Sequence, residues 1–213
     1  MATKAPITTV IYESGYGSSA RFYERAIQHL GMTASGVRKK GRGVQLKFAI
    51  GETSLGAVLV ALSTRGVAAI ELGEDPEALL QQFQLRFADA ELVGDDPEFN
   101  GLIAQVIGFI ERPGQAFPLP LDIRGTAFQR QVWEALMAIP LGETTSYGAI
   151  ATAIGKPHAY RAVAGACAAN KLAIAIPCHR VVRLDGSLSG YRWGVETKRA
   201  ILALEKSALE QEG

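Results

Sequence analysis

Cysteine is scarce in this 213-residue sequence, which contains only Cys167 and Cys178. Two cysteines cannot form a disulfide scaffold, and without a Cys-rich cluster we expect no metal site. No apolar run reaches the roughly 18 residues that a transmembrane helix needs, and the first residues lack the apolar stretch and cleavage site of a signal peptide. Internal repeats and low-complexity tracts are also missing. These absences exclude a membrane-spanning protein and lead us to expect a cytoplasmic location.

The composition is that of an ordinary globular protein, with 48% hydrophobic and 20% charged residues. The length allows one large domain or two small ones. The net charge of +1 is unevenly distributed: residues 1–44 contain seven Lys and Arg against two Asp and Glu, residues 45–121 four against eleven, and residues 122–213 eleven against eight. This pattern indicates separate functional regions, of which the basic ones are compatible with a polyanion such as nucleic acid.

The first 121 residues show two different periodicities. Helical spacing of apolar residues predicts a helix over 20–30, and a Gly-rich linker follows near residue 42. From residue 45 onward, apolar runs bounded by turn residues predict three antiparallel strands, over 45–50, 56–62 and 67–72. Acidic residues, which favour a helix N-terminus, introduce two further predicted helices, over 76–87 and 97–111. Residues 45–121 therefore predict a small α+β subdomain, and no motif within it indicates a chemistry.

Residues 122–213 are predicted to be mostly helical. Thr126 and Ser146 are placed to cap two helices, and the second of them, over 147–154, is followed by a short turn and a third helix over 160–169. Two helices joined by a short Gly-containing turn are the outline of a helix-turn-helix. The third helix consists largely of Ala and Gly, so it can approach another surface closely. Both DNA and a neighbouring helix of the same protein fit this description.

The residues around Cys178 suggest a nucleophile. An apolar run leads into Pro177-Cys178-His179, so a proline fixes the backbone before the cysteine and an imidazole follows it. A thiol is nucleophilic only as the thiolate, which an imidazole base can generate and stabilise. The imidazole needs a partner that fixes its tautomer, and Glu205 in a predicted helix over 196–206 is a candidate. Cys167, within the Ala-rich helix, is predicted to be a small buried hydrophobic residue. By themselves these residue types leave a cysteine peptidase open.

Four motifs agree in order and distance over residues 126–206. They are the string Ile176-Pro-Cys-His-Arg-Val-Val182, the stretch Arg161-Ala-Val-Ala-Gly-Ala-Cys-Ala-Ala-Asn170, the pair Gly190-Tyr191, and Glu205. Together they resemble the active domain of the O6-alkylguanine-DNA alkyltransferases, most closely the bacterial Ada-type members. The resemblance implies DNA repair by irreversible, single-turnover transfer of an alkyl group, chiefly methyl, from O6 of guanine to Cys178. O4-methylthymine would be a less favoured substrate.

The resemblance also implies roles for five residues in the chemistry. Cys178 would accept the alkyl group, and His179 would take the thiol proton through a bridging water. Glu205 would hold the imidazole, and Asn170 would brace the turn between the recognition helix and the active-site strand. Tyr147 would lie by the DNA backbone and donate a proton to N3 of the departing guanine. The lesion supplies the alkyl group and the protein its acceptor, so no cofactor is expected.

Recognition of double-stranded DNA would use the helix-turn-helix in the minor groove, followed by flipping of the damaged nucleotide. Arg161 would enter the base stack in place of that nucleotide, with Tyr147, Ala162 and Ala168 also at the DNA surface. Further residues would form the substrate pocket: Tyr191, Trp193, Arg192 and Val181, the last two through their backbones together with that of Cys178. The indole of Trp193 narrows such a pocket, which predicts that methyl is accepted more readily than benzyl.

The implied fold class is α+β with three parts. Residues 1–44 would be a partial AraC-type helix-turn-helix and linker, residues 45–121 an RNase H-like α/β subdomain, and residues 122–213 the mostly helical alkyltransferase domain. Only the second helix-turn-helix of AraC-type regulators is resembled, over residues 7–40, so autonomous promoter activation is not expected. Two cysteines cannot supply the four ligands of the zinc domain of Ada-type proteins, so phosphotriester repair is not expected either.

Two other functions compete with alkyl transfer. A lesion-sensing transcription regulator without transfer activity is the main alternative, but alkyltransferase-like proteins of that kind lack the acceptor cysteine that is present here as Cys178. A cysteine hydrolase would leave the remaining motifs unexplained. We therefore expect a monomeric, nucleoid-associated repair protein with no protein partner.

Overall fold

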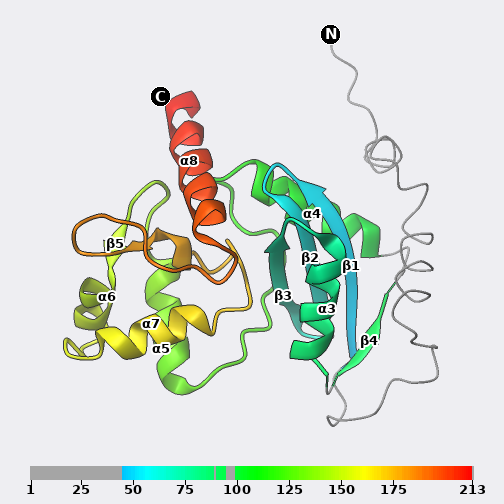
Figure 1. Ribbon diagram of the computed structural model, residues 1–213, viewed down its shortest axis with the longest axis horizontal. Coiled ribbons are helices and arrows are strands. Elements are labelled where there is room, and N and C mark those ends of the chain that lie inside the picture. The colour runs from blue at the N-terminus through cyan, green and yellow to red at the C-terminus, as the bar shows by residue number, and fades with distance from the viewer. Residues whose placement is uncertain (1–44, 89, 95–98, 213) are drawn as a thin grey trace.

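The computed structural model describes residues 45–88, 90–94 and 99–212, and these form two adjoining parts (Figure 1). One part contains a four-stranded sheet with helices α3 and α4, and the other contains helices α5 to α8. The helix predicted over 20–30 and the AraC-type module lie outside the described residues. The described structure confirms a mixed α+β fold with a small sheet.

The sheet has the strand order β3-β2-β1-β4. Strands β1 (Gln45–Thr53), β2 (Gly56–Ser63) and β3 (Gly66–Gly73) pair antiparallel, as predicted from apolar runs bounded by turn residues. Strand β4 (Glu91–Val93) pairs parallel with β1 and was not predicted. A strand of three residues is too short to show a periodic pattern in the sequence. The predicted sheet of three antiparallel strands therefore lacked this fourth, parallel strand.

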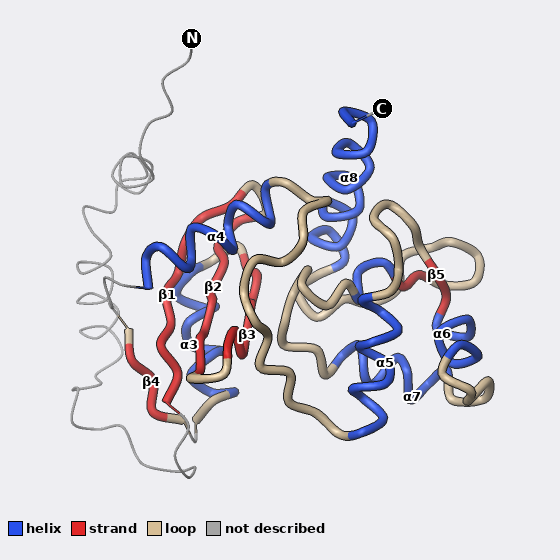
Figure 2. The backbone as a smooth tube through the Cα atoms, turned by 180° about the vertical axis from the view of Figure 1, so that it is seen from behind, coloured by secondary structure: helices blue, strands red, loops and turns tan. Residues whose placement is uncertain are grey.

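Each face of the sheet is covered by a different helix (Figure 2). On β2, Leu59 faces the cluster that contains α3 (Pro76–Arg86), whereas Val58 and Val60 face the cluster that contains α4 (Asn100–Glu111). Successive side chains of a strand point to opposite faces, so a strand buried on both sides is apolar throughout. This explains why β2 appears in the sequence as a continuous apolar run.

The outer edge of β3 connects the two parts of the protein. The amide of Val67 donates to the Pro120 carbonyl at 2.8 Å, and the amide of Ile70 donates to the Lys171 carbonyl at 2.8 Å. In return, the Ala173 amide donates to the Ile70 carbonyl at 3.0 Å. A sheet edge would otherwise present unpaired backbone groups. Here it fixes the segment after residue 170, which leads to Cys178.

The helical part comprises α5 (Ala127–Met137), α6 (Tyr147–Ala153), α7 (Tyr160–Ala168) and α8 (Val195–Glu212). The predicted caps are confirmed: Thr126 accepts a hydrogen bond from the Gln129 amide, and Ser146 accepts one from the Ala149 amide. Helix α8 extends six residues beyond the predicted end at residue 206. Two short strands, β5 (Thr145–Ser146) and β6 (Val181–Val182), pair parallel beside α6. Among the described helices, none is long and apolar enough to cross a membrane.

Candidate active site

Cys178 begins a single 3-10 turn, Cys178–Arg180, that leads into β6. Its amide donates to the Ile176 carbonyl at 2.8 Å, and only 5% of the residue is exposed. Pro177 precedes the turn with a φ of −79° and a ψ of 58°, and this ψ lies outside the extended range, so the chain bends as it enters Cys178. The resemblance implied an active-site strand after the turn that Asn170 braces, and the strand β6 begins three residues after Cys178.

Asn170 organises the segment between α7 and the cysteine. Its side-chain amide donates to the Ile176 carbonyl at 2.9 Å and to Cys178 Sγ at 3.2 Å, and its side-chain oxygen accepts from the Leu172 amide at 2.9 Å. The enclosed residue Ile174 has a φ of 65°, which is unusual for a β-branched side chain and costs about 1–3 kcal/mol. The buried Asn170 bonds and the pairing with β3 hold this strained segment in place.

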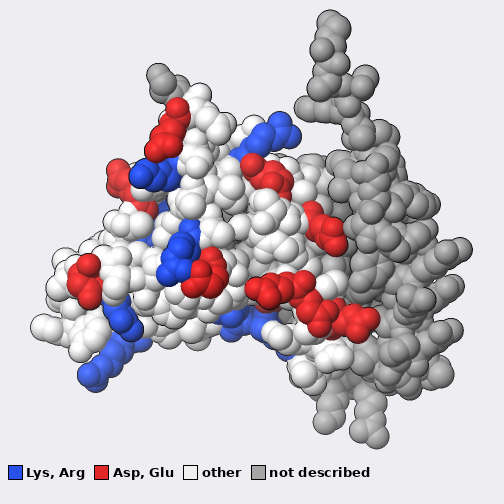
Figure 3. Space-filling view, turned by 45° about the horizontal axis from the view of Figure 1, so that its top comes forward, with Lys and Arg blue, Asp and Glu red and all other residues white. Residues whose placement is uncertain are grey.

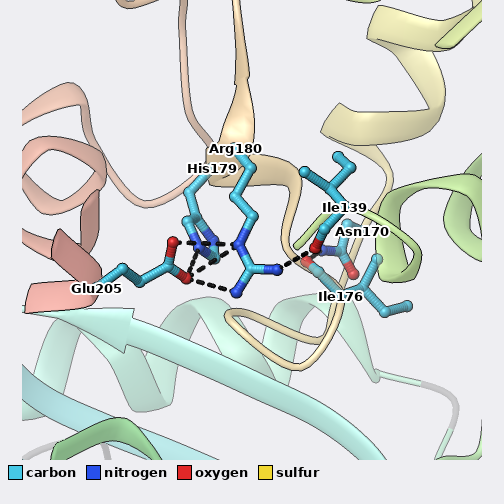
Figure 4. Close-up of polar contacts among 6 residues, drawn as sticks. All are labelled: Ile139, Asn170, Ile176, His179, Arg180 and Glu205. Atoms are coloured by element: carbon cyan, nitrogen blue, oxygen red, sulfur yellow. Dashed lines mark hydrogen bonds and ion pairs between the residues drawn. The ribbon is translucent and has the colours of Figure 1, made fainter. Parts of the chain in front are cut away.

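His179 and Glu205 form a buried pair to which Arg180 is added (Figure 4). His179 Nε2 and Glu205 Oε1 lie 2.8 Å apart, and both side chains are at most 1% exposed. Arg180 donates to both oxygens of Glu205, with its Nη2 2.7 Å from Oε1, and its Nη1 donates to the Ile139 carbonyl at 2.5 Å. His179 and Arg180 belong to the cysteine turn, and Glu205 belongs to helix α8. Through its bond to Ile139, Arg180 also connects this group to the segment that follows α5.

Burial and charge act in opposite directions on these groups. Burial raises the pKa of the Cys178 thiol, while the hydrogen bond from Asn170 and the charge of Lys198 oppose that shift. Burial lowers the pKa of His179, against the hydrogen bond and charge of Glu205. Burial alone would raise the pKa of Glu205, but hydrogen bonds from His179 and Arg180 outweigh it and lower the pKa to about 2. Glu205 is therefore ionised at neutral pH, and the resting thiol and imidazole are neutral.

The hydrogen bond to Glu205 also determines which imidazole nitrogen is basic. A neutral imidazole has one N–H, and an ionised carboxylate only accepts, so the proton lies on Nε2. Nδ1 is then the free acceptor, and it is buried with no hydrogen-bond partner among the described residues. This arrangement leaves a base with its lone pair available beside the cysteine turn.

Aromatic rings line the segment that follows the cysteine turn. The Tyr191 ring lies edge-on to His179 with centroids 6.4 Å apart, and Trp193 packs on Tyr191 at 5.1 Å. Trp193 Nε1 donates to Glu71 at 2.9 Å, and Glu71 also pairs with Arg86, so residues of the sheet part hold the indole. The Tyr191 hydroxyl is buried without a partner among the described residues. Of the two predicted pocket aromatics, Tyr191 is thus adjacent to His179, and Trp193 packs against Tyr191.

The other two predicted pocket residues make backbone-directed contacts. The Val181 carbonyl accepts from the Lys198 ammonium at 2.5 Å, and Val181 itself is buried. The exposed Arg192 donates from its Nε to the Ala168 carbonyl at the end of α7, at 2.9 Å. The second contact ties the segment after the cysteine to the end of the helix that resembles the recognition helix.

Helix α7 presents small side chains to solvent. Ala162, Gly165 and Ala168 are exposed, whereas Val163 is buried. A Cβ added to Gly165 would meet no atom within 4 Å, so its small size does not serve packing inside the protein. Of the two explanations left open by the sequence, this favours contact with an external surface.

Arg161 lies in the first turn of α7, exposed, with its guanidinium 5.6 Å from the centre of the Tyr160 ring. Tyr147 begins α6, half-buried, and its hydroxyl lies 2.7 Å from Ser189 Oγ. On the face shown in Figure 3, acidic side chains gather over the sheet-containing part. Residues 45–121 contain eleven acidic side chains and four basic ones, whereas residues 122–213, which include α6 and α7, contain eight acidic and eleven basic ones. The predicted DNA-contacting residues therefore lie outside the acidic region.

Sequence reasoning missed three polar residues of this site: Arg180, Ser189 and Lys198. Lys198 and Glu205 are seven residues apart on α8, with Ile201 between them, and all three are buried. The sequence did contain a signal for Lys198, because this charged residue stands at a position where the helical period requires an apolar one. Within the described ranges, no group of three or more His, Cys, Asp or Glu could hold a metal ion.

Comparison with known proteins identifies the chain's relatives. Residues 127–207 match the family model described as "6-O-methylguanine DNA methyltransferase, DNA binding domain". The chain is 49% identical over 205 residues to the bifunctional transcriptional activator/DNA repair enzyme Ada of Escherichia coli, covering 96% of this chain and 58% of that protein. It is 40% identical over 150 residues to the inducible methylated-DNA–protein-cysteine methyltransferase of Bacillus subtilis, covering 70% of this chain and 84% of that protein.

A solved structure gives the same result for the fold. Mycobacterium tuberculosis OGT in complex with DNA has a TM-score of 0.63 and 36% sequence identity, over 76% of this chain and 94% of that one. The chain spans 58% of the length of the Escherichia coli relative. The matched family model encloses Tyr147, Arg161, Asn170, Cys178 and Glu205. The chain belongs to the O6-alkylguanine-DNA alkyltransferase family, in its Ada-type branch.

Proposed function

We propose that this protein repairs double-stranded DNA by transferring the alkyl group of O6-alkylguanine, chiefly methyl, irreversibly to Cys178. The observation that supports this most directly is the buried Cys178 turn. Asn170 bonds its sulfur at 3.2 Å, and the adjoining His179 is paired with Glu205 at 2.8 Å. Relatives named as methylated-DNA–protein-cysteine methyltransferases support the same reaction.

The proposed first step is formation of the thiolate. His179 Nδ1 accepts the thiol proton, through a water, while Nε2–H donates to Glu205. Glu205 is held ionised by Arg180 and stabilises the imidazolium that results. The thiolate keeps the hydrogen bond from Asn170, and the charge of Lys198 favours it.

The proposed substrate reaches the sulfur only outside the helix stack. Cys178 is 5% exposed, so a base within a duplex cannot approach it in line, and the nucleotide must be flipped. In this proposal α7 enters the minor groove with its small residues against the DNA, and Arg161 fills the space that the nucleotide leaves. Tyr191, Trp193 and the backbones of Cys178, Val181 and Arg192 form the pocket that receives the base.

The proposed transfer forms a bond between Cys178 Sγ and the alkyl carbon while the bond from that carbon to O6 breaks. The departing guanine receives a proton at N3 from the Tyr147 hydroxyl, which avoids a purine anion. The product is a thioether, which has no acyl carbon for water to attack, so the cysteine is not regenerated. Each protein molecule therefore acts once and needs no cofactor.

We further propose the domain organisation that the family resemblance implies. Residues 45–121 form an RNase H-like subdomain that supports the active site, since Glu71 bonds Trp193 and β3 pairs with the segment after Asn170. Residues 122–213 form the active domain, and residues 1–44 a partial AraC-type module. We propose a nucleoid-associated monomer as the working form.

Intact-mass spectrometry after mixing with a duplex that contains O6-methylguanine tests the function. We expect one added methyl group per protein, located on Cys178 by peptide mapping, and no addition in Cys178→Ser. Cys167→Ser is the matched control, because Cys167 is also buried and burial raises its pKa to about 12, so it is a poor nucleophile. An unchanged mass with tight binding to the lesion would instead identify a lesion-sensing regulator.

A further inference from the structure

Three residues from separate segments form a hydrogen-bonded chain beside the cysteine turn. The Tyr147 hydroxyl at the start of α6 lies 2.7 Å from Ser189 Oγ, in the loop after β6. The Lys198 ammonium on α8 donates to the same Ser189 oxygen at 3.3 Å and to the Val181 carbonyl at 2.5 Å. Ser189 therefore lies between a buried cation and the phenol.

Lys198 is an unusual residue in this position. Its side chain is fully buried, and among the described residues no carboxylate forms an ion pair with it. A buried ammonium without a carboxylate is costly, so such groups are rare outside functional sites. Burial lowers the pKa of Lys198, which makes its proton easier to release.

The donor and acceptor properties of the three groups suggest a direction for the chain. An ammonium only donates, so Ser189 Oγ accepts from Lys198. Either oxygen could donate between Ser189 and Tyr147, but Tyr147 Oη is the only acceptor within reach of the Ser189 hydroxyl among the described residues, so we assign the Ser189 proton to that bond. The phenol proton of Tyr147 is then not used by Ser189 and is available to another acceptor. Burial raises the pKa of Tyr147, and the hydrogen bond with Ser189 opposes that shift without cancelling it. A buried phenol in these surroundings is a weak acid without assistance.

We propose that Ser189 is a positioning residue that orients the Tyr147 hydroxyl toward the leaving base and connects it to the Lys198 proton. This inference rests on the proposed function and deepens it. As the carbon–O6 bond breaks, the Tyr147 proton moves to the base, the Ser189 proton moves to the Tyr147 oxygen, and a Lys198 proton moves to Ser189. The chain ends with a neutral amine at Lys198, and no phenolate accumulates.

The test compares two alkyl donors, one whose leaving group needs a proton and one whose leaving group does not. Departure of guanine needs a proton, whereas departure of iodide from iodoacetamide needs none. In Ser189→Ala we expect methyl transfer from an O6-methylguanine duplex to slow about tenfold, the equivalent of one hydrogen bond. Labelling of Cys178 by iodoacetamide, followed by peptide mapping, should stay within about twofold of the original rate.

Three further variants separate positioning from loss of structure. Ser189→Thr retains the hydroxyl and should recover the transfer rate. Ser187→Ala changes an exposed serine of the same loop, whose side chain bonds Asp185, and should match the original protein with both donors. In a Tyr147→Phe protein, Ser189→Ala should cause no further loss, because the phenol through which Ser189 acts is absent.

The outcomes distinguish this proposal from the function on which it rests. If the original protein labels with iodoacetamide but takes no methyl from the duplex, the proposed function fails, and this proposal with it. If the original protein transfers methyl, a Ser189→Ala protein with an unchanged rate overturns the proposal alone. Equal slowing with both donors, or additive losses with Tyr147→Phe, would also overturn it.

Discussion

Replacing Glu205 by Gln should make the stability of the protein less dependent on pH in the acidic range. The substitution keeps the shape and one oxygen acceptor, but removes the charge that His179 and Arg180 share. A carboxyl pKa lowered from 4.5 to about 2 corresponds to about 3 kcal/mol of unfolding free energy at neutral pH. Breaking a buried ion pair typically costs about 3–5 kcal/mol, so two independent arguments give a similar size.

The sign follows from the direction of the shift. Because the pKa of Glu205 is lowered in the folded protein, its contribution is complete above pH 4.5 and is lost as the pH falls toward 2. The difference between the original protein and Glu205→Gln should therefore shrink from about 3 kcal/mol at pH 6 to about 1 kcal/mol at pH 3. Because burial lowers the pKa of His179, protonation of this imidazole also destabilises both proteins as the pH falls. Glu205 opposes that shift, so the His179 contribution is measured separately with a His179→Asn protein over the same pH range.

Urea unfolding followed by tryptophan fluorescence, from pH 3 to pH 7, measures these differences. Glu210→Gln is the matched control, because Glu210 is an exposed residue of the same helix and its loss should cost no more than about 0.5 kcal/mol. A difference that stays constant across the pH range would refute the argument. So would a Glu205→Gln protein as stable as the control.

Three further predictions concern recognition. Arg161→Ala should slow repair of a duplex by about tenfold or more, because the side chain would no longer offset the few kcal/mol that nucleotide flipping costs, but it should hardly change the reaction with free O6-benzylguanine. Equal losses with both substrates in a mass-spectrometric rate assay would contradict insertion of Arg161 into the base stack. Trp193→Gly should speed the reaction with O6-benzylguanine by about tenfold, because a group that fits a pocket poorly costs about 1–3 kcal/mol. An unchanged rate would show that the indole does not limit the size of the pocket. Gly165→Leu should stabilise helix α7 by about 0.5–1 kcal/mol, since nothing lies within 4 Å of an added Cβ, but it should weaken duplex binding as measured by fluorescence anisotropy. Binding as tight as that of the original protein would show that this face of α7 does not contact DNA.

Local sequence signals predicted the elements of this fold well. The strands β1 to β3 follow from alternating or continuous apolar runs, and the caps at Thr126 and Ser146 follow from single residues with a known preference. Strand β4 is too short to produce such a signal. Its place beside β1 depends on a parallel pairing across about 45 residues, which no local pattern encodes.

The proximity of the candidate residues was predictable, but their supporting contacts were not. Residue types and family motifs selected Cys178, His179 and Glu205 as candidates, and the structure brings His179 and Glu205 within 2.8 Å of each other. The bond from Trp193 to Glu71 joins residues 122 positions apart, and only the folded chain reveals it. Lys198 is a charged residue at a position where the helical period requires an apolar one, but this signal does not say which groups the ammonium contacts.

Burial of the acceptor has a consequence for selectivity. Burial favours the neutral thiol and the neutral imidazole, so the resting protein holds an unreactive cysteine. In the proposed mechanism, proton transfer from Cys178 to His179 separates charge, but each charge has a partner already in place: Asn170 for the thiolate and Glu205 for the imidazolium. Because Arg180 keeps Glu205 ionised, fixed groups and not water would meet the cost of activation. On this proposal the thiolate forms without exposing the sulfur, and an alkyl donor must enter the proposed pocket in order to meet it.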